Sequence, residues 1–213
     1  MRYAILGSLS TVPSSGYDLA RQFDTGLDAY WSAAHSQIYP ELKRLEDAGL
    51  VESSPTTVGE KLEKRVYAIT DEGLDALKTW AAAPPLYKPI RDPERLQFLF
   101  SDLGDIEPIR AHLQTHLVRF EEQRARLEQS LNAIRAGQHE RIAKRVEGRP
   151  PAQQALTLML RDLAYIGNIR RCEVEIEWAK EALAELDAYE REHGSAEERA
   201  APRRKARRSA TRS

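Results

Sequence analysis

Apolar positions in the first third of the chain recur at the spacing of short amphipathic helices. In segment 35–48, Ile38, Leu42 and Leu45 follow one another at i, i+4 and i+7 and so share one helix face. Gly49 follows directly, as is typical at the C-terminus of a helix. Similar but shorter patterns predict two earlier helices, over residues 3–9 and 15–23.

After Gly49 the pattern changes to short runs rich in β-branched residues. Residues 50–53 and 65–69 are predicted strands, and residues 55–61 are the predicted tip of a hairpin. Thr70 is a favourable N-cap for a fourth helix that runs to about Ala82. Three helices, a two-stranded hairpin and a closing helix predict a winged helix-turn-helix. In some proteins such a small module binds DNA, and in others it binds another protein.

The second half of the chain carries two long segments with an apolar stripe, over residues 109–134 and 156–186. As helices they would be roughly 45 and 55 Å long. Because a small domain cannot cover stripes of that length, we expect pairing with a second chain. A monomeric helical hairpin is the alternative. The residues expected at the dimer interface are Phe120, Leu127, Leu163, Ile166, Ile176 and Leu183.

Proline and charge mark the expected domain boundaries within a mainly α-helical chain. The proline-rich stretch around residues 84–89 cannot continue a helix. We therefore predict a winged helix-turn-helix domain over 1–83, a linker over 84–92, a helical dimerisation region over 93–194 and a disordered basic tail over 195–213. The tail carries seven basic and two acidic residues, although the net charge of the chain is −1. It is expected either to add unspecific attraction to phosphates or only to aid solubility.

The polar face of segment 35–48 carries side chains suited to DNA. Serine and glutamine can bond base edges, tyrosine can contact a phosphate or stack, and lysine and arginine neutralise phosphates. A solvated face on an ordinary helix is the alternative, since residues 1–83 hold eight basic and twelve acidic side chains. The candidate DNA contacts, with the hairpin cations included, are Tyr17, Ser36, Gln37, Tyr39, Lys43, Arg44, Lys61, Lys64 and Arg65.

Four stretches of this N-terminal region resemble the PadR family of bacterial transcriptional regulators. They are YAILG at 3–7, SGYDL at 15–19, SQIYPELKRLEDAGLV at 36–51 and VYAITDEG at 66–73. The resemblance implies a winged-helix homodimer that usually represses transcription. A two-fold dimer in turn predicts a pseudo-palindromic operator. By position it implies that Ser36, Gln37, Tyr39 and Lys43 meet double-stranded DNA.

The hairpin tip departs from the family pattern. Members often carry Gly-Arg-Pro there, whereas this chain has Gly59-Glu60-Lys61-Leu62. An arginine in the minor groove is therefore not expected, and Lys61 or Lys64 is the candidate replacement. A protein-interaction module without specific DNA recognition is the second hypothesis for the whole chain.

Other chemistry finds little support in the sequence. Nucleophile-elbow, phosphate-loop, dinucleotide-binding and zinc-protease motifs are absent, so we expect no enzyme, no cofactor and no metal. His112 and His116 stand at i, i+4 without a third ligand nearby, and a lone Cys172 excludes an internal disulfide. No apolar run approaches the roughly 18 residues of a membrane span, which predicts a cytoplasmic protein.

A short apolar helix is predicted over residues 93–103, between the winged domain and the long helices. Small molecules often bind at such junctions. A small hydrophobic effector is therefore a further expected partner, and its candidate contacts are Trp31, Trp80 and Phe98.

Overall fold

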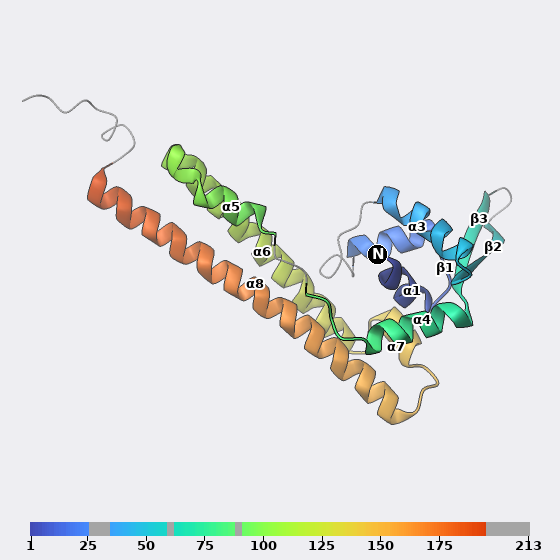
Figure 1. Ribbon diagram of the computed structural model, residues 1–213. Coiled ribbons are helices and arrows are strands. Elements are labelled where there is room, and N and C mark those ends of the chain that lie inside the picture. Colours follow the sequence, from blue (N-terminus) through green and yellow to red (C-terminus); the bar gives the residue numbers. More distant parts are fainter. Residues whose placement is uncertain (26–34, 59–61, 88–90, 195–213) are drawn as a thin grey trace, which may run out of the picture. The chain divides into compact units, whose positions relative to one another are not determined.

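The computed structural model describes residues 1–25, 35–58, 62–87 and 91–194 (Figure 1). Trp31, Lys61 and the predicted tail over 195–213 lie outside the described residues. The contacts divide the chain into two compact units. Unit 1 combines residues 1–88 with 123–170, and unit 2 combines 89–122 with 171–213. The two longest helices contribute to both units.

Four short helices enclose the core of unit 1. They are α1 (Arg2–Leu9), α2 (Gly16–Thr25), α3 (His35–Asp47) and α4 (Asp71–Ala82). Their apolar faces meet as the sequence predicted, and the fully buried side chains are Ile5, Leu6, Leu19, Ile38, Leu42 and Leu45. The expected stop of α3 is confirmed. Gly49 adopts φ +69°, and the Leu50 amide donates to the Leu45 carbonyl.

A small antiparallel sheet completes the winged fold, with strand order β1-β3-β2. The hairpin pairs β2 (Val51–Val58) with β3 (Leu62–Ile69), and Val51 lies opposite Ile69. Both strands are longer than expected, and β2 runs into the predicted tip, because Pro55 is tolerated on the edge strand and β-branched residues follow it. The predicted two-stranded wing also gains a third strand, β1 (Ser14–Ser15), which pairs with β3.

Long helices form most of the second half of the chain. They are α6 (Ile106–Arg135) and α8 (Pro151–His193), and shorter segments accompany them: α5 (Pro93–Leu99), the 3-10 turn η1 (Ser101–Leu103) and α7 (Glu140–Val146). The sequence predicted both long helices and the 93–103 segment, whereas α7 was missed. In the described residues no helix is long and apolar enough to cross a membrane.

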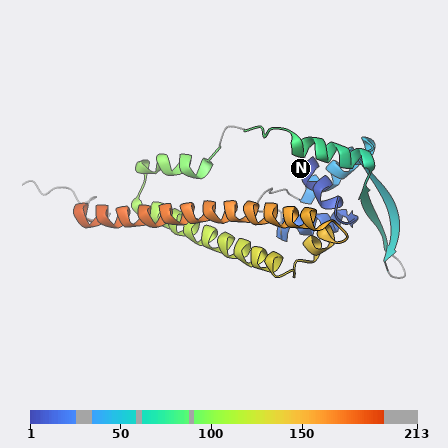
Figure 2. The ribbon, with the colours of Figure 1, turned by 90° about the horizontal axis from the view of Figure 1, so that it is seen from below.

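Within each unit, α6 and α8 lie side by side, as both ribbon views show (Figures 1 and 2). In unit 1, Arg135 donates to Asp162 at 2.6 Å, and in unit 2, Arg110 donates to Asp187 at 2.6 Å. This pairing of α6 with α8 covers part of the apolar stripe that was expected at the dimer interface. Leu127 and Ile176 are only 4% and 5% exposed in the single chain, so they leave little surface for a second copy.

The other predicted interface residues differ in exposure. Phe120, Ile166 and Leu183 are half-buried in the single chain, while Leu163 is 58% exposed. Helical periodicity identifies an apolar stripe but does not say whether the same chain or another copy covers it. Of the six, Leu163 is therefore the residue with the most surface left for a partner.

Candidate nucleic-acid interface

Helix α3 separates its apolar and polar side chains onto opposite faces. Ile38, Leu42 and Leu45 are fully buried in the core of unit 1. The exposed face carries the side chains that the sequence analysis singled out as DNA contacts: Ser36, Gln37, Tyr39, Lys43 and Arg44. This face combines hydroxyl, amide and cationic groups, which are the groups that read base edges and bind phosphates.

Two exposed tyrosines stand near each other at the start of α2 and on α3. Tyr17 is 65% exposed and Tyr39 is 53% exposed. The ring of Tyr39 lies over Gly16, so closely that a Cβ atom at position 16 would come within 2.5 Å of its Cε1. Gly16 thus leaves room for the Tyr39 ring, a role that the sequence analysis did not identify.

Substituting Gly16→Ala is expected to displace the Tyr39 ring without unfolding the domain, because a side chain can move where a backbone cannot. We expect a roughly tenfold loss of DNA affinity, the equivalent of one disturbed contact. Fluorescence anisotropy with a labelled duplex measures it, and circular dichroism checks the fold. In a Tyr39→Ala background, Gly16→Ala should lower DNA affinity little further. An equally large loss of affinity in that background would show that displacement of the Tyr39 ring is not the cause.

Three of the predicted cations are paired with carboxylates. Lys64 donates to Asp18 at 2.7 Å, Arg65 to Glu46 at 3.3 Å, and Arg44 to Glu41 at 3.1 Å. The first two pairs tie β3 of the wing to α2 and α3, the third lies within α3, and all three offset part of the positive charge of these cations. Lys43, by contrast, forms no ion pair within the described part of the chain. It is therefore the cation of α3 most available to a phosphate.

Asp18 is held ionised by its neighbours. Its carboxylate accepts from Lys64 and from the Ser15 hydroxyl, and these bonds lower its pKa below the ordinary value of 3.8. At the start of α2 the Ser15 amide also donates to the Asp18 carboxylate and the Asp18 amide to the Ser15 hydroxyl, which is the arrangement of a capping box. Since the pKa is lower in the folded chain, the charged form stabilises the fold above about pH 3.8. This contribution is lost as the pH falls through the lowered pKa.

Asp18→Asn should therefore lower the melting temperature at pH 7, and the gap to wild type should narrow as the pH falls below about 4. Thermal unfolding followed by circular dichroism between pH 7 and pH 3 measures the gap. Asp75→Asn on α4 is the matched control, because its pair with Lys78 is exposed on both sides and should contribute less. A gap that stays constant with pH would contradict the charge-based explanation.

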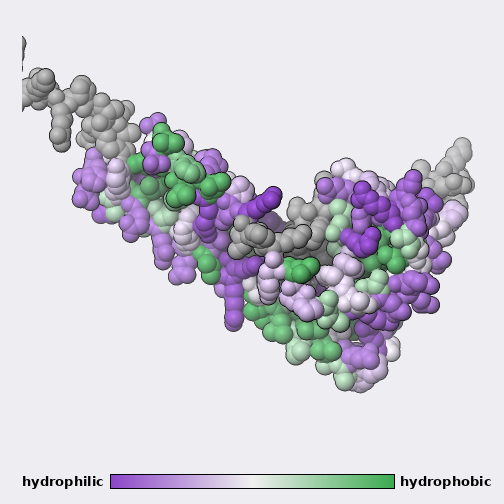
Figure 3. All heavy atoms as spheres, in the orientation of Figure 1, coloured by the Kyte–Doolittle hydropathy of each residue, from purple (hydrophilic) through white to green (hydrophobic). Residues whose placement is uncertain are grey.

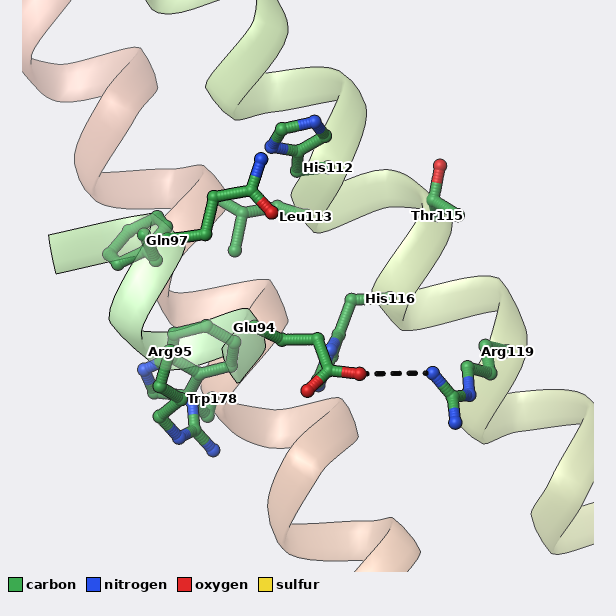
Figure 4. Close-up of a pocket in the computed structure, with 10 residues that line it drawn as sticks. Glu94, Arg95, Gln97, His112, Leu113, Thr115, His116, Arg119 and Trp178 are labelled. Carbon is green, nitrogen blue, oxygen red and sulfur yellow. Dashed lines mark ion pairs between the residues drawn. The ribbon is translucent and has the colours of Figure 1, made fainter. Parts of the chain in front are cut away.

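The two predicted effector contacts that the structure describes, Phe98 and Trp80, belong to different units. Phe98 lines a cavity of about 210 Å³ in unit 2, between α5, α6 and α8 (Figure 4). Its ring meets Trp178 edge-on at 5.5 Å, and the Arg95 guanidinium lies 3.9 Å above the Trp178 ring. Trp80 instead stacks on Tyr3 in unit 1, with ring centroids 4.7 Å apart.

Polar groups line the rest of this cavity. Glu94 and Arg119 form an ion pair of 3.5 Å across one side, drawn as the dashed line in Figure 4. His116 bonds Glu175 at 3.1 Å, and Arg95 donates to the same carboxylate at 2.6 Å. The cavity therefore joins an aromatic wall, which suits a small planar molecule, to two arginines that are already paired with carboxylates.

Two family models match the chain in sequence. The Transcriptional regulator PadR-like family matches residues 5–79, and Virulence activator alpha C-term matches residues 90–187. The chain carries a PadR-like domain over residues 5–79. Its second match agrees with a larger member that carries a C-terminal helical region, and this family consists of transcriptional regulators rather than enzymes.

Two curated relatives match part of this PadR-like chain. The negative transcriptional regulator PadR of Bacillus subtilis is 43% identical over 101 residues, which are 47% of this chain and 56% of that protein. A probable transcriptional regulator of Mycobacterium tuberculosis is 42% identical over 82 residues, 38% of this chain and 43% of that protein. The chain thus matches about half the length of these relatives.

Solved structures resemble most of the PadR-like chain. Bacillus subtilis PadR in complex with operator DNA has a TM-score of 0.65 and 29% identity, covering 87% of this chain and 97% of that one. The Vibrio cholerae virulence activator AphA has a TM-score of 0.61 and 29% identity, with coverage of 88% and 98%. Bacillus subtilis PadR with p-coumaric acid has a TM-score of 0.57 and 26% identity, with coverage of 87% and 94%.

Proposed function

We propose that this chain is a sequence-specific DNA-binding transcriptional regulator that represses its targets as a homodimer. The observation that carries the proposal is the exposed face of α3, where Ser36, Gln37, Tyr39 and Lys43 project opposite a fully buried apolar face. The relatives support it, since one is a negative regulator and one resembling structure holds operator DNA.

The homodimer is supported by apolar surface that a single chain leaves uncovered. Figure 3 shows such surface over α5 and over the first turns of α8. The exposed residues in unit 2 include Leu96, Leu99, Phe100 and Leu103, and those in unit 1 include Leu156, Met159, Leu160 and Leu163. Contiguous exposed apolar residues mark protein interfaces, and a second copy is the partner that dimeric repressors use.

Leu163→Glu is expected to weaken self-association at least tenfold, because it places a charge in an interface that should be dry. Size-exclusion chromatography with light scattering, over a dilution series, gives the dimer dissociation constant. Gln129→Glu, an exposed position on α6, adds the same charge as a control. A monomer at micromolar concentration in the wild type would contradict the dimer.

The test of the function is footprinting on the DNA upstream of the chain's own reading frame, because repressors commonly act locally. We expect protection of an inverted repeat, with half-sites one helical turn or a multiple of it apart. Absence of protection there and in a pool of random duplexes would contradict DNA recognition. It would favour the protein-interaction module.

Ligand response is the finer part of the proposal. The relative that was solved with p-coumaric acid supports a small aromatic effector, and the cavity that Phe98 lines is our candidate site for one. Phe98→Ala should reduce p-coumarate-induced release of the operator, whereas Val118→Ala, exposed on α6 and outside the cavity, should not. An equal response in both variants would place the effector elsewhere.

A further inference from the structure

Helix α7 is fastened to the winged domain by two arginines. Arg141 donates to the Ser8 carbonyl at the end of α1, at 3.1 Å. Arg145 donates to the hydroxyls of Ser10 and Thr11, at 3.0 and 2.9 Å. Both side chains are half-buried, and their contacts are all to uncharged oxygens. The guanidinium charges are thus partly removed from water without a negative partner.

Two further arginines add to this positive charge. Arg149 follows α7, and Arg161 lies on α8. Burial first, and then the charges of Arg161, Arg149 and Arg141, lower the pKa of Arg145. Burial, followed by the charge of Arg161, lowers the pKa of Arg141. We call these four residues the α7 arginine cluster.

The α7 arginine cluster lacks a counter-charge in the described part of the chain. No carboxylate there forms an ion pair with any of the four. Arg95, Arg110 and Arg135, by contrast, each hold one or two carboxylates at 2.6 Å. Half-buried like charges are costly unless they are paired. The cluster therefore has the electrostatic character of a site whose anion comes from outside the chain.

His139, directly before α7, adds a polar atom without a hydrogen-bond partner. Its Nδ1 atom is buried and has no hydrogen-bond partner. Burial and the charges of Arg141 and Arg161 lower its pKa, which favours the neutral ring. In a neutral imidazole one ring nitrogen donates a hydrogen bond and the other accepts one. The Nδ1 atom without a partner is therefore a second unsatisfied group beside the arginines.

We propose that the α7 arginine cluster binds a small phosphate-like oxyanion, which offsets part of the charge of the four guanidinium groups and fixes α7 against α1. Guanidinium forks match the paired oxygens of phosphate or sulfate. A small ion is favoured over a DNA backbone, because Arg141 and Arg145 are half-buried against α1 rather than projecting as exposed phosphate contacts do. The site goes beyond the proposed function, and its occupancy is expected to stabilise unit 1.

Inorganic phosphate is the probe, and thermal unfolding of the full chain is the readout. The wild type should melt at a higher temperature in sodium phosphate than in sodium chloride of equal ionic strength, as any ligand of the folded state requires. Arg161→Gln should need about tenfold more phosphate for the same shift. In chloride it should melt no lower than the wild type, because the substitution relieves repulsion.

Arg170→Gln, which removes an exposed arginine of the same helix, is the matched control and should respond to phosphate as the wild type does. No phosphate shift in the wild type, or an equal shift in Arg161→Gln, would overturn the proposal. The salt dependence of DNA binding supplies a second arm. If the slope of log DNA affinity against log salt concentration is unchanged in Arg161→Gln, the small ion is supported. A slope reduced by about one would assign the cluster to duplex phosphates and overturn the proposal.

Discussion

Replacing Tyr39 and Lys43 together by alanine is expected to reduce operator affinity by about 100-fold or more. Each lost base or phosphate contact costs roughly 1–3 kcal/mol, and both side chains project from the exposed face of α3. Neither contributes to the buried core, so the fold and the dimer should persist. Fluorescence anisotropy on the footprinted operator measures the loss, at fixed salt because the phosphate term depends on it.

The control for this double variant is Lys78→Ala with Thr79→Ala. Both positions are exposed, but they lie on α4 rather than on α3. Losing Lys78 changes the net charge as much as losing Lys43 does, so a purely electrostatic effect would appear in both variants. Equal losses in the two would indicate unspecific attraction, and retained affinity in the α3 variant would move the DNA contact to another surface.

The largest expected effect on stability is that of Gly73→Ala. Gly73 is buried in the first turn of α4, where its amide donates to the N-capping Thr70 hydroxyl at 3.1 Å. A Cβ atom there would overlap the Leu50 carbonyl oxygen and crowd Ile69. Since a backbone carbonyl cannot rotate away, α4 would have to shift off the sheet. We expect a loss of about 3 kcal/mol in the free energy of unfolding, measured by urea denaturation.

Gly7→Ala, in the same domain, is expected to change the free energy of unfolding in the opposite direction. A Cβ at Gly7, inside α1, would meet nothing within 4 Å. Alanine should therefore stabilise the helix by about 0.5–1 kcal/mol. If Gly73→Ala were as stable as Gly7→Ala, the described approach of α4 to Leu50 would be wrong.

The sequence predicted those parts of the fold in which one helix face is apolar. Helix α3 was predicted to within one residue, because Ile38, Leu42 and Leu45 mark its buried face and Gly49 its end. Strand β1 and helix α7 were missed. Two serines show no alternation, and the charged stretch 140–146 has no stripe, so tertiary contacts rather than local pattern define both.

The candidate site was only partly predictable for the same reason. Residue type and spacing identified the polar face of α3. They could not show that Lys64 and Arg65 are held by Asp18 and Glu46, which lie 46 and 19 residues away. Nor could they show that Gly16 makes room for Tyr39, because that contact joins two helices. Contacts between distant segments follow from packing, which a single sequence does not reveal.

The most direct test of the account is to map where the start of α3 lies on DNA. An iron–EDTA reagent attached to Ser36→Cys cleaves the duplex next to its point of attachment, and Cys172 is too buried, at 2% exposure, to compete for the label. The account predicts two clusters of cuts within the operator, related by its two-fold symmetry and spaced by about one helical turn of 34 Å or a multiple of it. The control carries the same reagent at Thr79→Cys on α4. If both variants bind the operator and Ser36→Cys cuts it no more strongly than this control does, the proposed position of α3 on DNA is contradicted.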